Sequence, residues 1–268
     1  MRDAAVTIFH FALPHKVDSM GGSTDYNADK WGKLDTLKVL VLDTEHFIVF
    51  IDHDNDLDWI TSDEYDAKGH KDISKHHDVV NKIALLECKP LNHFDDKTIV
   101  NYKRLLGEAL SRSLKDDYVK ALNILEHAEG YIKDRGSELA RKWYLDTAGK
   151  TTIIILIVGI YAWMFRVSCV EIFGKTAFYL YLSMVSGALG ALLSIIFRMG
   201  KENLDCLAGK EIHERESIFR IVAGMLSAYL GALLVSADLF LPVFSKVNKT
   251  EVALVLIGFI SGMSERFA

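Results

Sequence analysis

The sequence predicts a mainly α-helical protein in two parts: a cytoplasmic helical domain with a small β-hairpin, followed by a four-helix transmembrane bundle. Charge is concentrated in residues 1–150, which hold 21 Lys and Arg against 27 Asp and Glu, whereas residues 151–268 hold 10 against 9. Apolar stretches of membrane length follow Lys150, and apolar residues recur at helical spacing before it. A soluble helical core is the weaker alternative, because several such stretches in succession leave few polar faces for water.

Residues 1–94 form the first predicted region. The N-terminal stretch "MRDAAVTIFHFALPHK" has a polar start and only a short apolar run, which is unlike a signal peptide, so we expect this region in the cytoplasm. Further on, "TLKVLVL" and "FIVFI" flank the polar "DTEH". Runs rich in Val, Ile and Phe favour a β-hairpin here, with a short helix as the alternative.

An acidic stretch, "DHDNDLDWITSDEYD", follows this hairpin. Its alternate carboxylates resemble the ligands at positions 1, 3 and 5 of a calcium-binding hand, but Leu57 stands where the sharp turn needs Gly, and the last position has Asp instead of Glu. A solvated acidic loop is therefore the preferred interpretation. The candidate calcium ligands are Asp52, Asp54, Asp56, Asp58 and Asp63.

Four histidines and a cysteine lie close together in the sequence, without the paired spacing typical of zinc sites. Surface or capping histidines are the preferred interpretation, and no metal and no cofactor is predicted. The three cysteines are far apart in the sequence, so we expect no disulfide. The residues in question are His70, His76, His77, Cys88 and His93, with Cys169 and Cys206 as the remaining cysteines.

Residues 95–150 are predicted to form a cytoplasmic helical hairpin and a juxtamembrane helix. "DDKTIVNYKRLLGEALSRSLK" and "DDYVKALNILEHAEGYIKDR" each carry an apolar stripe, and "SELARKWYLDTAGK" makes a third helix towards the membrane. The hairpin has the small Ala residues of a tetratricopeptide-like unit. Because one such unit does not bury its own face, it belongs to a small helical domain or docks a partner.

The transmembrane domain, residues 151–268, is predicted to cross the membrane at about 151–170, 176–197, 218–240 and 252–267. With the N-terminus inside, the inner flanks of these segments carry nine Lys and Arg and the outer flanks four. The positive-inside rule then favours a multi-pass protein of the inner membrane with both termini in the cytoplasm. The last segment is short, because only 13 uncharged residues separate Glu251 from Glu265.

Small residues at four-residue spacing predict close helix packing in the last three segments, within one protomer or between protomers. The first segment is bulkier and is expected at the periphery. The predicted packing positions are Gly187, Gly190, Gly224, Gly231, Gly258 and Gly262.

Charges within or near these segments are candidates for a role in the membrane, since an ionisable group at depth tends to face a partner or water. Those near helix ends have a simpler interpretation, in which the side chain reaches back to the interface. The candidates are Arg166, Arg198, Arg220, Asp238, Glu265 and Arg266.

No catalytic triad, nucleotide-binding loop or carboxylate pair emerges, so no enzymatic activity is predicted. The net negative charge of residues 1–150 also disfavours direct contact with the negatively charged phosphate backbone of a nucleic acid.

Four stretches together resemble a family of bacterial four-helix membrane proteins from anti-phage defence loci, encoded beside retron reverse transcriptases. The resemblance covers roughly residues 95–268 and rests on "NYKRLLGEALSRSLKDDYVKALNILEHAEGYI", "GALGALLSIIFRMGKENLDCLAGKEIHERESIFRI", "VAGMLSAYLGALLVSADLF" and "GFISGMSERFA". The recurring positions of that family fall on Gly187, Gly190, Arg198, Arg220, Gly262, Glu265, Arg266 and Phe267.

The resemblance implies a toxic effector that the reverse transcriptase with its RNA-linked DNA holds inactive, so that contact with nucleic acid is indirect. Release on infection would permeabilise the inner membrane and stop the cell, as in abortive infection, and the effector would be a homo-oligomer within a larger complex. The alternatives are a membrane anchor or scaffold that recruits a cytoplasmic partner, and a regulated channel.

Overall fold

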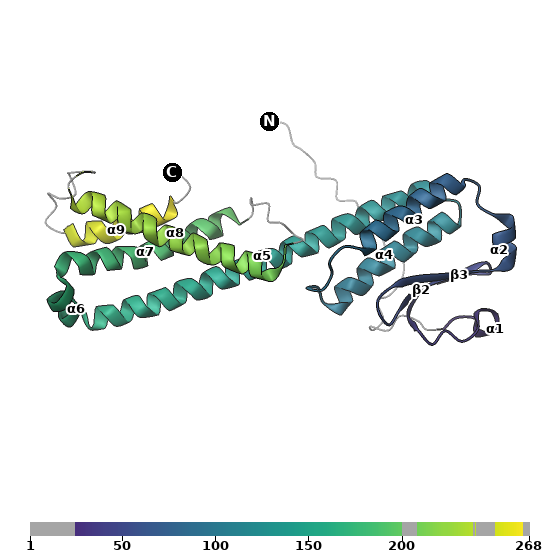
Figure 1. The fold of residues 1–268 in the computed structure, drawn as a ribbon, viewed down its shortest axis with the longest axis horizontal. Coiled ribbons are helices and arrows are strands. Elements are labelled where there is room, and N and C mark those ends of the chain that lie inside the picture. The colour runs from purple at the N-terminus through teal and green to yellow at the C-terminus, as the bar shows by residue number, and fades with distance from the viewer. Residues whose placement is uncertain (1–24, 200–207, 238, 240–249, 265–268) are drawn as a thin grey trace, which may run out of the picture. The chain divides into compact units, whose positions relative to one another are not determined.

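The computed structural model describes residues 25–199, 208–237, 239 and 250–264 (Figure 1). The chain divides into two compact units, residues 1–88 with 96–125 (unit 1) and residues 89–95 with 126–268 (unit 2). The division falls inside a long helix and not at residue 150, where the sequence suggested a boundary. Each unit is described by itself.

Unit 1 contains a three-stranded antiparallel sheet in the order β1-β2-β3. The predicted hairpin is confirmed by β1 (Leu37–Asp43) and β2 (Phe47–Asp52), and Thr44 closes the turn by donating its hydroxyl to the Phe47 carbonyl at 2.7 Å. The third strand, β3 (Leu57–Thr61), lies within the stretch that the sequence suggested was an acidic loop, and it pairs with β2 along its whole length.

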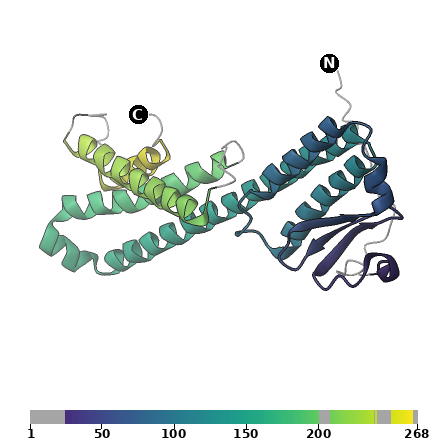
Figure 2. The same ribbon diagram turned by 45° about the vertical axis from the view of Figure 1, so that its right-hand side comes forward.

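The central strand β2 is buried on both faces, from Phe47 to Ile51. On one face, Ile48 and Phe50 pack with residues of the segment that contains α1 (Ala28–Trp31). The other face is covered by α4 (Asp96–Leu114), as Figure 2 shows. Gly107 makes this approach close, since a Cβ there would lie 3.0 Å from a Val41 methyl group.

Two further helices of unit 1, of 6 and 15 residues, begin with side-chain caps. α2 (Asp63–Lys68) begins after Ser62, whose hydroxyl accepts from the Tyr65 amide, and α3 (Ile73–Glu87) begins after Asp72, which accepts from Lys75. α3 packs against α4, where the buried Tyr102 donates to the Leu86 carbonyl at 2.9 Å.

One continuous helix, α5 (Tyr118–Met164), replaces three elements that the sequence suggested were separate. The second arm of the predicted hairpin, the juxtamembrane helix and the first apolar segment all belong to it. No proline interrupts this stretch. Its four glycines, at 130, 136, 149 and 159, keep negative φ and so interrupt nothing, although each costs about 0.5–1 kcal/mol relative to Ala.

Unit 2 continues with α6 (Arg166–Phe173), α7 (Lys175–Arg198), α8 (Lys210–Ser236) and α9 (Thr250–Met263). The apolar segment predicted at 151–170 is not one helix, because α5 ends at Met164 and α6 begins at Arg166. A second break follows at Gly174, whose φ of 87° separates α6 from α7. Three helices, α5, α7 and α8, are long and apolar enough to cross a membrane, whereas α9 has 14 residues. A bundle of four membrane-length helices is thus only partly represented in the described residues.

Candidate functional site

The helices α7, α8 and α9 meet at a junction built from glycine. Gly187 of α7 lies at its centre: a Cβ on Gly262 of α9 would come within 2.6 Å of the Gly187 Cα, and a Cβ on Gly187 would come within 2.8 Å of the Gly224 carbonyl oxygen of α8. Backbones therefore approach closely on both sides of α7. Any larger side chain at these positions must displace backbone, which does not yield easily.

The other three predicted glycines extend the same junction. A Cβ on Gly258 would lie 2.5 Å from the Ser183 carbonyl oxygen, and one on Gly190 would meet the backbone of Phe259 and Met263. Gly231 of α8 faces Ser261 of α9. All six glycines singled out in the sequence therefore lie at contacts among these three helices.

Two buried serines of α7 tie the junction together with hydrogen bonds. Ser183 donates to the Ala228 carbonyl of α8 at 3.2 Å, and Ser186 donates to the Val255 carbonyl of α9 at 2.7 Å. Later residues of α7 contact later residues of α9, since Ser186 meets Val255 and Gly190 meets Phe259 and Met263, so these two helices are parallel. Later residues of α7 contact earlier residues of α8, since Ser183 meets Ala228 and Gly187 meets Gly224, so α8 is antiparallel to both.

The part of α5 that lies in unit 2 packs differently. Tyr144 and Ala148 join a buried cluster with Ala188, Ala191 and Ile221, and Ser217 of α8 donates to the Tyr144 carbonyl at 3.0 Å. A Cβ on Gly159 would meet the Val185 side chain, not backbone. Side chains thus separate α5 from the other helices, as the bulk of its sequence led us to expect.

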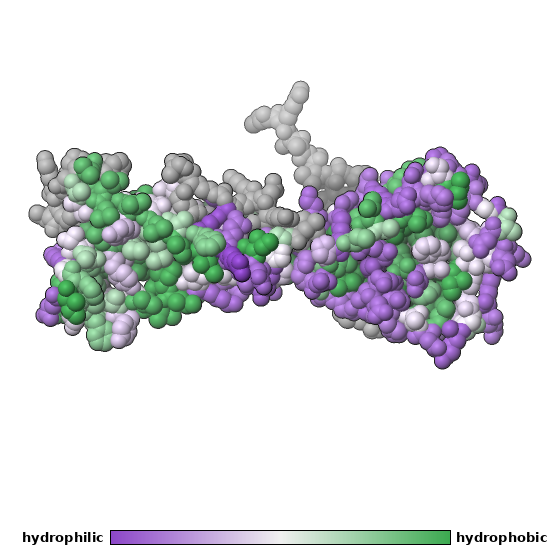
Figure 3. Space-filling view, in the orientation of Figure 1, coloured by the Kyte–Doolittle hydropathy of each residue, from purple (hydrophilic) through white to green (hydrophobic). Residues whose placement is uncertain are grey.

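A wide apolar surface covers the outside of unit 2, visible as the hydrophobic area over these helices in Figure 3. Large aliphatic and aromatic side chains stay exposed along α5, α7, α8 and α9. Such a surface greatly exceeds the scattered apolar residues of an ordinary soluble surface. Members on three helices are Ile153, Ile157, Ile160, Phe219, Leu226, Leu230, Val252, Leu256 and Ile260.

The predicted membrane charges lie in separate places. The Arg166 guanidinium lies 5.6 Å from the Trp163 ring centre, while that of Arg220 lies 5.5 Å from the Tyr144 ring centre and also pairs with Glu216 at 3.2 Å. Arg198 lines a cavity of about 380 Å³ between the ends of α7 and α9. Asp238, Glu265 and Arg266 lie outside the described residues, as does Phe267.

Sequence reasoning missed one ion pair of this unit. Lys175, the first residue of α7, pairs with Glu251 in the first turn of α9. Lys175 was counted among the four cations of the outer flanks, and Glu251 was used only as the start of the uncharged run. No local pattern connects two residues this far apart in the chain, so the pair emerges only when α7 and α9 are seen to start side by side.

The five aspartates of the acidic stretch do not form the loop of a calcium-binding hand. Asp52 ends β2, Asp58 lies within β3 and Asp63 begins α2, so strand pairing fixes a hairpin where a single loop was required. Within the ranges that the structure describes, no group of His, Cys, Asp or Glu is arranged to hold a metal ion. Burial, together with Asp52 and Asp56, raises the pKa of Asp58.

A buried lysine balances part of this acidic group. Lys103 of α4, whose side chain is only 5% exposed, pairs with Glu87 at 2.7 Å and lies 3.7 Å from Asp56. Because a buried ion must be paired, this arrangement indicates a structural role for these residues.

The predicted histidines divide between the units. In unit 1, the rings of His70 and His76 stack with centres 3.7 Å apart, and His76 Nδ1 lies 2.9 Å from the Ser113 hydroxyl. Burial and the neighbouring His70 and His77 lower the pKa of His76 to about 4. His93 belongs to unit 2, where its ring meets that of Trp143 edge-on.

Tyr65 completes the polar group around this stack. Its hydroxyl donates to the Leu114 carbonyl at 2.5 Å and lies 3.4 Å from His70 Nδ1. Burial, with Asp116 nearby, raises the pKa of Tyr65 to about 12. The group joins the loop between α2 and α3 to the end of α4.

Comparisons of this chain with models of protein families, with curated proteins and with solved structures find no match.

Proposed function

We propose that this protein is a membrane effector without enzymatic activity, which permeabilises the inner membrane of a bacterium when a cytoplasmic inhibitor releases it. The observation that carries the proposal is the glycine junction of α7, α8 and α9, surrounded by exposed apolar side chains. In lipid, helices gain no hydrophobic energy by associating, so close backbone packing at small residues is the means that remains. A soluble protein does not need both features at once.

The direction of the helices supports a multi-pass arrangement. α7 and α9 are parallel and α8 is antiparallel, as successive crossings of a bilayer require. With the positive flanks inside, this arrangement leaves both termini in the cytoplasm. The 14 residues of α9 span about 21 Å at 1.5 Å per residue, less than the hydrocarbon core of about 30 Å, so α9 locally thins the bilayer or begins below its surface.

Unit 1 is the proposed docking surface for the inhibitor. In the family that the sequence resembles, the inhibitor is a retron reverse transcriptase with its RNA-linked DNA, and the effector acts in defence against phage. The acidic balance of residues 1–150 favours contact with the protein and not with the nucleic acid. Homo-oligomers then form the lesion, within a larger complex.

The experiment is expression of the full chain in bacteria without the inhibitor, with membrane potential followed by a voltage-sensitive dye. The parent protein is expected to depolarise the cells within minutes of induction. Gly262→Leu should abolish depolarisation at equal membrane abundance, because its side chain meets the Gly187 backbone. Gly149→Leu is the matched control, since a Cβ there meets nothing within 4 Å, and it should act as the parent does.

A second candidate function is a non-conducting scaffold. The observation in its favour is the edge strand β3, where Trp59 is 43% and Ile60 38% exposed, because exposed apolar residues on an edge strand suit partner docking. A scaffold predicts a protein in the membrane fraction that leaves the membrane potential unchanged at any expression level. That result would overturn the effector proposal.

A further inference from the structure

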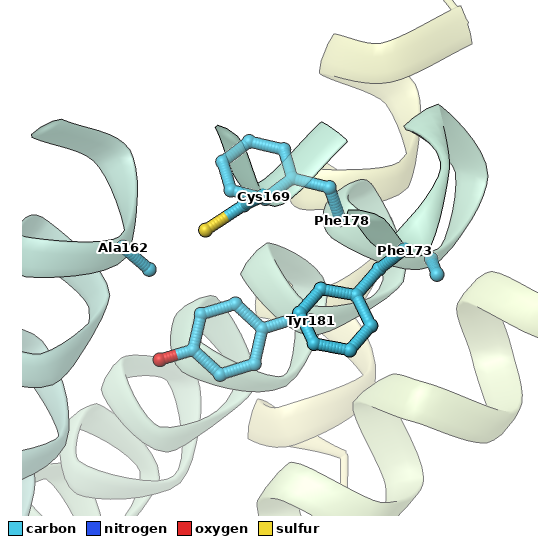
Figure 4. Close-up of a pocket in the computed structure, with 6 residues that line it drawn as sticks. Ala162, Cys169, Phe173, Phe178 and Tyr181 are labelled. Atoms are coloured by element: carbon cyan, nitrogen blue, oxygen red, sulfur yellow. The ribbon is translucent and has the colours of Figure 1, made fainter. Parts of the chain in front are cut away.

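A cavity of about 360 Å³ lies where α5, α6 and α7 meet, away from the glycine junction. Its volume falls in the range of about 300–1,000 Å³ typical of ligand pockets. Figure 4 shows side chains from all three helices around the space. The lining residues are Ala162 of α5, Cys169 and Phe173 of α6, and Ala177, Phe178 and Tyr181 of α7.

Local sequence explains why the space is left open. Among the residues that line the space, Ala162 of α5 and Ala177 of α7 have small side chains that fill little of it. The chain leaves α5 at Met164 and turns again at Gly174, a left-handed position that suits glycine. Between these two breaks, α6 holds Cys169 and Phe173 against the space.

The walls of the cavity are almost entirely apolar. Aromatic rings of Phe173, Phe178 and Tyr181 and two alanine methyl groups form most of them, and the Cys169 sulfur behaves as a small apolar group. A polar ligand would lose its hydrogen bonds to water without replacement. An alkyl chain loses nothing on entering.

A cation lies beside one wall of this cavity. The Arg166 guanidinium lies over the Trp163 ring, and that ring stacks on Phe178 with centres 6.3 Å apart. Arg166 also precedes Cys169 by three residues on α6, which places both on neighbouring positions of one helix face. Among the described residues Arg166 has no carboxylate partner, whereas the nearby Lys175 is paired with Glu251.

Aromatic residues mark this end of the helices as a membrane interface. Trp and Tyr gather at the level of lipid head groups, and Tyr161, Trp163, Tyr179 and Tyr181 all occur here. A cation at that level is well placed to attract a lipid phosphate.

We propose that this cavity binds one acyl chain of an anionic phospholipid whose phosphate pairs with Arg166. The inference rests on the proposed placement of unit 2 in a membrane. An acyl chain leaves one apolar surrounding for another when it enters the cavity, so the chain itself adds little selectivity. The head group therefore provides the preference, and one arginine near the surface corresponds to about a five-fold preference for an anionic lipid.

The test is native mass spectrometry of the full chain in mild detergent, with phosphatidylglycerol or phosphatidylcholine of identical acyl chains added at equal concentration. The parent protein should retain one phosphatidylglycerol about five-fold more than phosphatidylcholine. Arg166→Gln should bind both lipids equally, because its cation is lost and its cavity is kept. Arg198→Gln, which changes the cation beside the cavity between the ends of α7 and α9, should keep the parent's preference.

A second variant tests the cavity itself. Ala162→Phe fills the space and should lose both lipids, whereas Ala223→Phe, at an exposed alanine of α8, should bind as the parent does. Circular dichroism and elution volume establish that each variant folds. Parent-level binding by Ala162→Phe, or an unchanged preference in Arg166→Gln, overturns the inference.

The two proposals fail separately. A protein that depolarises cells but shows no preference between the two lipids leaves the effector proposal standing and removes the lipid site. A protein that stays in the soluble fraction removes both.

Discussion

The two units are held together by opposite kinds of core. In unit 1, large side chains such as Ile48, Tyr102 and Leu106 are completely removed from water. In unit 2, the closest contacts of α7, α8 and α9 are made by Gly, Ala and Ser, and many large side chains point outward, although Leu180, Leu254 and Ile257 are buried in a cluster beside them. Water drives the first arrangement through the hydrophobic effect, whereas in the membrane proposed above lipid would remove that drive from the second. Substitutions that enlarge or shrink a side chain should therefore act in opposite ways in the two units.

The largest effect is expected where the glycine junction is filled. Gly187→Leu places a side chain against the Ala228 methyl group and the Gly224 carbonyl, so the helices must separate. We expect a loss of more than about 4 kcal/mol in the stability of unit 2, beyond the usual range for an overpacked core. Titration of the purified protein from mild detergent into dodecyl sulfate, followed by tryptophan fluorescence, measures it.

The control for this substitution is Gly149→Leu in α5. Open space surrounds that position, and Leu is the better helix former by about 0.8 kcal/mol, so stability should stay level or rise slightly. Equal losses in the two variants would mean that the junction is not the core of unit 2.

The converse substitution tests unit 1. Leu106→Ala empties a fully buried position on α4, and cavities of this kind cost about 2–5 kcal/mol. Hydrogen exchange of the β2 amides in the full chain should accelerate accordingly. Leu85→Ala on α3 is the control, because that side chain is 72% exposed and its loss should leave the exchange of β2 unchanged.

Local sequence patterns predicted which residues lie in these cores better than they predicted which residues contact one another. The rows of small residues identified the glycines that lie at the junction, because the spacing along one helix is visible in the sequence. Which row faces which helix is a tertiary property, and so the contact of Gly187 with Gly262 was not foreseen. Charges behaved similarly, because nothing in the local sequence indicated that Lys175 pairs with Glu251.

The acidic stretch shows more clearly how tertiary pairing can override a local sequence pattern. Alternate aspartates at 52, 54, 56 and 58 suggested a loop by composition, yet Leu57 to Thr61 pair with β2 as a strand. Pairing with a buried neighbouring strand outweighs the low strand propensity of Asp. In α5 the absence of a helix-ending signal was available in the sequence, but the change from charged to apolar residues suggested separate elements.

Unit 1 should also lose stability in mild acid. His76 is half-buried and its pKa is lowered to about 4, so the unfolded chain, with a pKa near 6.5, binds a proton first as the pH falls. The stability that neutral His76 contributes to unit 1 is fully present above pH 6.5 and declines between pH 6.5 and 4. We expect a loss of about 1–2 kcal/mol after solvent screening is allowed for.

His76→Gln isolates this effect, because glutamine can still bond to the Ser113 hydroxyl without titrating. In this variant the stability of unit 1 against denaturation should be less sensitive to pH between 6.5 and 4, even though His70, His77 and Asp116 remain beside position 76. His53→Gln, at an exposed position of unit 1 that does not contribute to the shift, should retain the parent's sensitivity to acid. A variant at position 76 with the parent's pH profile would assign the acid sensitivity to another group.

The smallest effect concerns the hydroxyl bonds at the junction. Ser186→Ala removes a bond of 2.7 Å to the Val255 carbonyl of α9 without changing the close approach of the helices. Interhelical hydrogen bonds in membranes average about 0.6 kcal/mol, because the separated helices find other partners, so a loss of that order is expected in the dodecyl sulfate titration. Ser236→Ala is the control, since its hydroxyl bonds only to Leu233 of its own helix. If Ser186→Ala cost as much as Gly187→Leu, hydrogen bonding and not backbone proximity would hold α9 to α7.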